Sequence, residues 1–532
     1  MKKGEEARGI ISEYRFPDRG YIVREDGKVL VKHAVPGREV AYRVTKARKG
    51  SAEGRVLETL QPGACETRES RCPAVGSCGG CLYQTLPYEE ELALKSELLE
   101  RLLGEAVRED FLWEGLTPSP LAEGYRMKME YSFGDAYRDG PLCLGMHKRG
   151  SHYDIVETDH CELVHEDFNL ALRETLRFFR ERNIPYYHKM RHEGYLRYLL
   201  VRRGTHRKEL LLDLVTSSQL PKEEEAELLT GWRQRMVDLP FAATLKGVLH
   251  TVTDSVADAI KDERTEVLFG ATQFEEELSG LRFVITPFSF FQNNADGAEL
   301  LYAKVGQYVG ETGGKVVFDL YSGTGTIAQL VAKHAERTVG VELVEEAVIA
   351  ARENAARNGV RNCRFIAGDV LKVLDEIEEK PDIIILDPPR EGVNPKALRK
   401  LIRYGVPRII YVSCKPSSLL TDLEILREGG YHTTRAAVRE MEEILQSQRE
   451  ELAAMQNALR IFADSQRAYR KLVKYYYSRN FTADNKRFDR GELSVLSSAE
   501  VLTEDAVYDM MGERYELTLD MLELATKLIR ER

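Results

Sequence analysis

One cysteine stands where it could act as a nucleophile. Cys414 follows an apolar run and lies in the segment Tyr411–Pro416, Tyr-Val-Ser-Cys-Lys-Pro. Ligands of open α/β sheets bind outside the carboxyl ends of the strands, and the thiolate is the reactive form of cysteine, which the charge of Lys415 could favour. A buried structural cysteine is the alternative, because free cysteines are commonly buried. The preceding motif Asp387–Arg390, Asp-Pro-Pro-Arg, favours the nucleophile.

A second segment has the composition of a loop that cradles a small molecule. Val316–Thr326 ends a predicted strand with small residues and opens a helix, so that its backbone can approach a nucleoside or amino-acid group closely. A plain tight turn would also explain the two glycines. Glu342, at the end of the next predicted strand, favours the ligand, because an acid there can accept hydrogen bonds from both ribose hydroxyls. Asp369 ends a third strand, where it could approach the adenine end or cap a helix.

Three cysteines are spaced closely enough to bind one metal centre. Cys72, Cys78 and Cys81 follow the pattern C-x5-C-x2-C. Eight cysteines in a chain with no export signal favour metal binding or catalysis over a disulfide framework. A fourth ligand is required, and the spacing alone leaves zinc and an iron-sulfur cluster both open. The cysteines without a motif are expected to be ordinary thiols: Cys65, Cys143 and Cys363.

The elements that must position these residues indicate several domains, as expected for 532 residues. Short alternating segments in residues 1–60 predict a small β-barrel of the OB type. Residues 61–285 contain the cysteine cluster, a helix at 86–104 that could pack on the catalytic domain, and a mixed α+β region. Strands and helices alternate through 286–438, which predicts a doubly wound, Rossmann-like α/β sheet. Apolar residues near a heptad spacing predict an all-α extension at 439–532, as a helical bundle or a coiled coil.

Charge and hydropathy restrict the classes of partner that the protein is expected to bind. The net charge of -10 argues against bulk polyanion binding, whereas residues 1–60 carry fourteen Lys and Arg against nine Asp and Glu. That excess could form a local basic face that meets phosphate, or be an ordinary solvated surface. No run is apolar enough for a signal peptide or a membrane span, so a cytoplasmic protein without a membrane partner is expected.

Taken together, these motifs resemble a known family. Asp319–Gly325 is similar to the first motif of class I S-adenosylmethionine-dependent methyltransferases. With Asp387–Arg390 and the Cys414 motif, the chain resembles the RNA (uracil-5-)-methyltransferases, specifically their bacterial 23S ribosomal RNA members. Pro287–Asn294, Pro-Phe-Ser-Phe-Phe-Gln-Asn-Asn, looks like the phenylalanine-glutamine segment of that family. The resemblance implies S-adenosylmethionine as cofactor, with contacts at Gln292, Tyr321, Glu342 and Asp387.

The resemblance also implies a mechanism on uracil. The thiolate of Cys414 would add to C6 of the ring and make C5 an enolate-like carbon nucleophile. That carbon would take the methyl group, a base would remove the C5 proton, and elimination would free Cys414. Asp387 would position the edge of the base through hydrogen bonds. The uridine must leave its stack, which is easiest in a single strand or loop of 23S ribosomal RNA.

The same resemblance bears on the cysteines and on the N-terminal barrel. These family members hold a four-iron four-sulfur cluster whose distant fourth ligand matches Cys161. Its role is expected to be structural and RNA-positioning, because the methyl transfer requires no electron. Residues 1–60 resemble a TRAM domain, a small RNA-binding barrel. Because uracil-5-methyltransferases of transfer RNA generally lack both features, their joint presence favours ribosomal RNA.

The resemblance ends near residue 435. The family's last sheet strand and its histidine-valine-glutamate segment, whose glutamate accepts the proton, have no match after Val438. The chain passes instead into Arg439 and a helical tail, and residues 441–532 resemble a small bacterial domain of uncharacterised function. A fusion protein, monomeric, is therefore expected. The alternatives are an RNA-binding homologue with impaired turnover, and an adaptor whose tail recruits a partner protein.

Overall fold

A computed structural model describes residues 1–151, 153–255, 260, 264–310 and 312–439, together with Lys471, Val473, Lys474 and Lys486. The chain divides into two compact units, Met1–Gln448 and Arg449–Arg532. The predicted helical domain at 439–532 therefore lies almost entirely outside the described residues. Arg439, the first residue of that predicted domain, ends the strand Arg435–Arg439.

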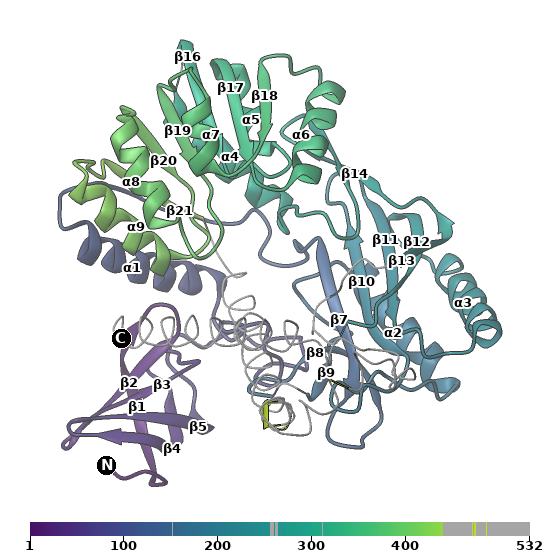
Figure 1. Ribbon diagram of the computed structural model, residues 1–532. Helices are drawn as coiled ribbons and strands as arrows, with labels where there is room; N and C mark the ends of the chain where they lie inside the picture. The colour runs from purple at the N-terminus through teal and green to yellow at the C-terminus, as the bar shows by residue number, and fades with distance from the viewer. Residues whose placement is uncertain are drawn as a thin grey trace. The chain divides into compact units, whose positions relative to one another are not determined.

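The N-terminal residues form the predicted β-barrel (Figure 1). Its five strands close in the order β1-β2-β3-β5-β4. Their bounds are β1 Glu6–Arg15, β2 Arg19–Arg24, β3 Gly27–Val31, β4 Glu39–Arg48 and β5 Ser51–Gln61. Side chains alternate between the two faces of a strand, so every second apolar residue enters the barrel core. That core includes Ile11, Ile22, Val29, Val31, Val40 and Tyr42.

One long helix contacts both the barrel and the C-terminal part of the first unit. α1, Tyr88–Val107, carries three glutamates in its first turn, where they interact favourably with the helix dipole. Its Leu98 packs into the barrel core. At its end, the carbonyl oxygens of Ala106 and Val107 accept hydrogen bonds from Arg427 of α9, Pro416–Glu428, at 3.2 and 3.3 Å.

The middle of the chain forms a seven-stranded mixed sheet of order β13-β12-β11-β10-β7-β8-β9. The strands are β7 Lys128–Asp135, β8 Leu142–His147, β9 Ile155–Glu157, β10 Leu196–Arg203, β11 Glu209–Thr216, β12 Thr244–Val252 and β13 Arg264–Gly270. Helices α2, Glu166–Glu181, and α3, Lys222–Val237, bury their apolar sides against it. Phe168, Phe179 and Trp232 are completely buried in this core.

A parallel five-stranded sheet follows, with strand order β18-β17-β16-β19-β20. Its strands are β16 Thr312–Leu320, β17 Ala335–Glu342, β18 Cys363–Ala367, β19 Ile383–Leu386 and β20 Arg408–Tyr411. Before it come the hairpin β14 Phe274–Leu278 and β15 Leu281–Ile285, and helix α4 Ala295–Val309. Its helices are α5 Thr326–Val331, α6 Glu345–Arg357, α7 Val370–Glu376, α8 Pro395–Tyr404 and α9.

Two apolar cores lie on opposite faces of this sheet. Alternate residues of β16 separate into them, since Val317 packs with α4 and α5 whereas Phe318 packs with α7 and α8. The predicted doubly wound arrangement is confirmed. Strand order reverses between β16 and its neighbours β17 and β19, and ligands bind at such a switch point, beyond the carboxyl ends of the strands.

The last described strand does not extend this sheet. β21, Arg435–Arg439, pairs in parallel with β6, Leu112–Thr117, and Arg435 lies opposite Leu112. Within the described residues, the five-stranded sheet therefore ends at β20. In the same part of the chain, no helix is both long and apolar enough to cross a membrane.

Candidate active site and metal centre

The loop after β16 has the backbone of a ligand cradle. Tyr321 adopts a φ of 66°, which strains a bulky residue and is typical of ligand clamps. The backbone N–H groups of Tyr321 and Ser322 both donate to the carbonyl oxygen of Val341, at 2.9 and 3.1 Å. Gly325 has a φ of 77°, and a Cβ there would come within 2.6 Å of the Phe365 ring. Only glycine therefore fits this turn into α5.

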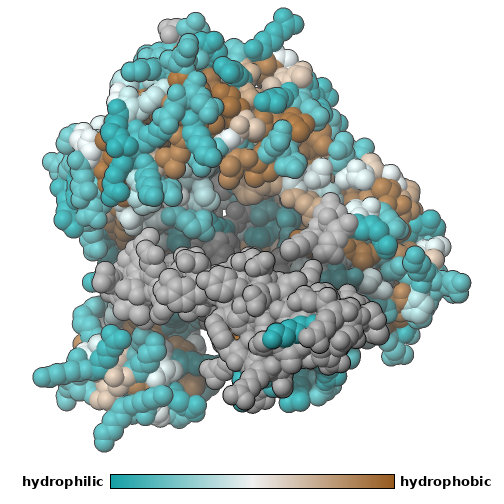
Figure 2. All heavy atoms as spheres, in the orientation of Figure 1, coloured by the Kyte–Doolittle hydropathy of each residue, from teal (hydrophilic) through white to brown (hydrophobic). Residues whose placement is uncertain are grey.

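Glu342 is fixed against this loop. Its carboxylate accepts hydrogen bonds from the backbone N–H groups of Gly323, at 3.0 Å, and Val344, at 2.9 Å. Each carboxylate oxygen keeps a second lone pair, so the same group can still accept from two ribose hydroxyls. The next residue, Leu343, is 70 % exposed and presents apolar surface beside the acid. Apolar side chains are exposed among charged ones on the surface of this domain (Figure 2).

Asp369 acts as a helix cap. Its side chain accepts a hydrogen bond from the Leu371 N–H at 2.8 Å and starts α7, which was one of the two roles expected for it. Its charge still reaches the cradle. Burial raises the pKa of Tyr321 to about 12, and the nearby carboxylate of Asp369 contributes to that rise. Asp369 and Tyr321 are therefore neighbours at the carboxyl edge of the sheet.

A buried carboxyl group that the sequence did not single out lies under the cradle. Asp319 is completely buried, and its Oδ2 accepts from the Ala328 N–H at 2.9 Å, whereas its Oδ1 has no hydrogen-bond partner among the described residues. Burial raises the pKa of Asp319 to about 8, and repulsion from Asp387 adds to the effect. Burial also raises the pKa of Asp387 to about 7. Burial therefore moves the pKa of both carboxyl groups from the acidic range towards neutral pH.

Cys414 lies between β20 and α9, with its side chain exposed. Enough protein surrounds the thiol for burial to raise its pKa, while the charge and hydrogen bond of Arg390 lower it and the charge of Asp387 raises it. The structure thus brings the two sequence motifs together, as expected for neighbouring strand ends. The role of Arg390 was missed, although its place in the motif was noticed.

The phenylalanine-glutamine segment is anchored from the central sheet. Arg202 of β10 is 3 % exposed and donates to the carbonyl oxygens of Thr286, at 2.7 Å, and Ser289, at 2.6 Å. Phe290 then lies 77 % exposed. Gln292 is half-buried in the coil before α4, and no described contact joins it to the other predicted cofactor residues. No sequence pattern points to Arg202, because it is distant along the chain from the segment that it anchors.

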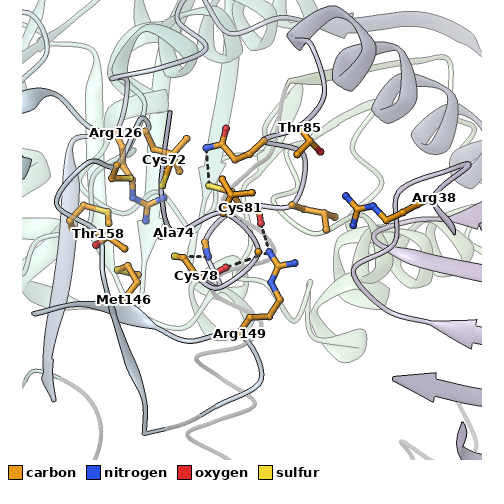
Figure 3. A pocket seen from close by; sticks show the side chains of 18 residues that line it. Arg38, Cys72, Ala74, Cys78, Cys81, Thr85, Arg126, Met146, Arg149 and Thr158 are labelled. Atoms are coloured by element: carbon orange, nitrogen blue, oxygen red, sulfur yellow. Dashed lines mark hydrogen bonds between the residues drawn. The ribbon is translucent and has the colours of Figure 1, made fainter. Parts of the chain in front are cut away.

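The four predicted metal ligands line one pocket. Three of them, Cys72, Cys78 and Cys81, are labelled in Figure 3. Cys72, Cys78 and Cys81 lie in the loop of residues 72–81, called the cysteine loop below, and Cys161 follows β9. Burial raises the pKa of Cys161 to about 12, and the charges of Cys72 and Cys78 raise it further. The four residues predicted to share a centre are therefore brought together.

The lining of this pocket suits an anionic metal–thiolate centre. Three arginines contribute to it, Arg38, Arg126 and Arg149, and the guanidinium of Arg38 is also paired with the carboxylate of Glu66. Arg149 also donates to the carbonyl oxygens of Cys78, at 3.4 Å, and Cys81. Thr158 Oγ1 is buried in the same lining without a hydrogen-bond partner among the described residues. The described structure brings no three of the cysteine sulfurs within 4.8 Å of one another.

Comparison with known proteins decides the family. The chain is 44% identical over 431 residues to an uncharacterised RNA methyltransferase of Clostridium tetani, covering 81% of this chain and 93% of the relative. An uncharacterised RNA methyltransferase of Caldanaerobacter subterraneus is 46% identical over 441 residues, covering 83% and 96%. The chain belongs to the RNA methyltransferases. A methyltransferase-domain model matches residues 311–476, and a domain of unknown function (DUF4298) matches 438–524.

A solved structure resembles this RNA methyltransferase over most of its length. It is the tRNA (uracil-54, C5)-methyltransferase of Pyrococcus abyssi in complex with S-adenosyl-L-homocysteine. The identity is 26% and the TM-score is 0.61, with 79% of this chain and 92% of that chain covered. The C-terminal family match agrees with the predicted fusion to a domain of uncharacterised function.

Proposed function

We propose that this RNA methyltransferase transfers a methyl group from S-adenosylmethionine to C5 of a uridine, through a bond between Cys414 and C6. The observation that carries this proposal is the placing of Cys414 with Arg390 and Asp387 at the edge of the sheet that also carries the cradle. The solved relative, named as a uracil C5 methyltransferase, supports the same chemistry.

The cradle residues would hold the methyl donor. Glu342 suits the ribose, Tyr321 and Asp369 lie at the adjoining loop ends, and Gln292 and Asp387 complete the predicted set. S-adenosylmethionine supplies an electrophilic methyl group on a sulfonium. The apolar surface of Leu343 beside Glu342 suits the face of a nucleoside base.

Cys414 and Asp387 meet two of the acid–base demands of the reaction, the activation of the thiol and the hydrogen bonding of the uracil edge. Cys414 must lose its proton to attack C6, and Arg390 favours the thiolate by charge and hydrogen bonding. Cys414 also lies two residues before α9, whose N-terminal dipole favours an anion. With a pKa near 7, Asp387 can both donate to and accept from the edge of uracil at neutral pH. A base then removes the C5 proton and Cys414 leaves.

We propose both the structural context of the target uridine and the kind of RNA that carries it. A uridine in an RNA loop follows from the chemistry, because C6 must be reached outside the stack. The sequence resemblance favours 23S ribosomal RNA. The Pyrococcus abyssi enzyme acts on transfer RNA and aligns with 79% of this chain, so the barrel and the cysteine loop do not by themselves exclude transfer RNA.

For the metal centre we propose a four-iron four-sulfur cluster held by Cys72, Cys78, Cys81 and Cys161. The sequence resemblance supports an iron-sulfur cluster over zinc, and in such a cluster each of the four thiolates binds a different iron. Arg126 and Arg149, which line the pocket, would balance the negative charge of the cluster. A structural role is proposed, because methyl transfer moves no electron to or from the centre.

A trapping experiment tests the chemistry without requiring turnover. RNA containing 5-fluorouridine is incubated with the protein and S-adenosylmethionine, because fluorine at C5 cannot leave as a proton does. We expect a denaturation-resistant protein–RNA adduct, mapped to Cys414 by peptide mass spectrometry. An adduct at another residue, or none despite RNA binding, would contradict the proposal. An adduct without release of 5-methyluridine from natural RNA would identify the turnover-impaired homologue.

A further inference from the structure

We propose that Ser418 and Asp422 of α9 are positioning residues that hold Arg390 against Cys414 and thereby set the reactivity of the cysteine. This inference rests on the proposed role of Cys414. It concerns contacts that neither motif contains, because both residues follow the cysteine motif and lie on the helix behind it. Four residues apart, they share one face of α9.

Ser418 binds the backbone of the arginine itself. Its Oγ lies 2.6 Å from the carbonyl oxygen of Arg390 and 3.1 Å from that of Lys415. The hydroxyl therefore lies between the backbone of Lys415, which follows Cys414, and that of Arg390, whose guanidinium acts on the thiol by charge and hydrogen bonding. A change in this contact shifts the Arg390 backbone relative to Cys414 directly.

Asp422 binds the loop that follows β19 at Val393, three residues after Arg390. Its side chain is 3 % exposed, and Oδ2 accepts from the Val393 N–H at 2.7 Å and from the Tyr411 hydroxyl at 2.5 Å. Gly392 packs directly on this carboxylate, since a Cβ there would lie 2.7 Å from Oδ2. Asp422 thus joins the loop after β19 to the end of β20.

The two contacts together fix the surroundings of the thiol. The charged and titratable groups that act on Cys414 are Arg390, Asp387 and Tyr411, with Lys415 next in the chain. Arg390 favours the thiolate, whereas Asp387 opposes it. Hydrogen bonds at Arg390 and Val393 hold this loop, and so keep the guanidinium of Arg390 close to the thiol. If the loop moved away, the carboxyl group of Asp387 would still oppose the thiolate while the favourable charge of Arg390 would be lost.

The experiment measures the pH dependence of Cys414 alkylation in the full chain. Iodoacetamide labelling is followed at Cys414 by peptide mass spectrometry, which separates it from the other cysteines. We expect Ser418→Ala to raise the pKa of Cys414 by about 0.5–1 unit, because the favourable charge moves away. Ser417→Ala is the matched control, since Ser417 is exposed on the same helix. Ser418→Thr keeps the hydroxyl and should restore the wild-type profile.

A double-variant comparison separates positioning from a general loss of packing. If Ser418 acts through Arg390, Ser418→Ala should add no further shift in an Arg390→Ala background. An equal shift in both backgrounds, or an unchanged profile in Ser418→Ala, would overturn the inference. Asp422→Asn gives a second approach should Ser418→Ala fail to fold. Because alkylation needs no RNA, its outcome stands apart from the methylation test.

Discussion

Two carboxyl groups at the ends of β16 and β19 are costly to ionise in the free protein. The raised pKa of Asp319, about 8, means that the folded chain binds this proton more tightly than the unfolded chain does. Between about pH 4 and pH 8 the unfolded chain therefore holds fewer protons at this site, and stability falls as pH rises. Asp387, with a pKa of about 7, acts in the same direction.

Asp319→Asn should therefore stabilise the chain at high pH. The amide keeps an oxygen for the Ala328 N–H and removes the buried charge. We expect a melting temperature above that of the wild type at pH 8, equivalent to about 1–3 kcal/mol, with the gap narrowing towards pH 5. Asp382→Asn, at a partly exposed acid before β19, is the control. A gap that does not change with pH would contradict the assignment.

At the scale of elements, one side chain of the central sheet orders a segment of the catalytic part. Arg202→Gln removes the charged hydrogen bonds to the carbonyl oxygens of Thr286 and Ser289. We expect amide hydrogen exchange at residues 286–292 to become at least about tenfold faster, because such bonds are worth more than neutral ones. Arg207→Gln, an exposed arginine nearby, should leave this exchange unchanged. Equal protection in both variants would show that Arg202 does not order the segment.

The cysteine loop allows a direct test of its ligand set. In anaerobically purified protein, Cys161→Ser should lose the iron and the visible absorbance of an iron-sulfur cluster, because one of four thiolates is removed. Cys65→Ser is the matched control, since Cys65 is part-buried and lies outside the pocket. Full iron retention in Cys161→Ser, or zinc in the wild type, would contradict the proposed centre.

At this scale, the features that the sequence predicts are those set by local residue patterns or by sheet topology. The barrel, the parallel sheet and the meeting of Asp387 with Cys414 were predictable, because residue alternation and strand-end rules are local or topological. Cys161 could be chosen through the family resemblance alone. Cys161 is far along the chain from the cysteine loop, so no spacing pattern identifies it as the fourth ligand.

The missed residues act across distances that no local pattern records. Arg202 lies on the central sheet and holds the loop at Thr286, which precedes the parallel sheet. Asp319 is part of a recognisable motif, but the sequence does not show that its side chain is completely buried. Ser418 and Asp422 look like ordinary helix residues. In each case the role arises from the tertiary contact of one side chain with a distant backbone.

At the scale of the whole molecule, every described site residue belongs to the unit Met1–Gln448. A chain ending at Gln448 retains β21 and its pairing partner β6. We expect this shortened chain to form the 5-fluorouridine adduct within about twofold of the full-length rate, since nucleophile, cradle and barrel are all present. Loss of the adduct would place a required group in residues 449–532.

The most direct test of the central claim is formation of 5-methyluridine with labelled donor. The full chain, purified anaerobically, is incubated with S-adenosylmethionine carrying a deuterated methyl group and with unmodified 23S ribosomal RNA or transfer RNA, and the digested RNA is examined by mass spectrometry. We predict labelled 5-methyluridine at several turnovers per protein, falling by at least about three orders of magnitude in Cys414→Ala while the melting temperature stays unchanged. Absence of the labelled nucleoside from both RNAs, or its undiminished formation by Cys414→Ala, would contradict the account.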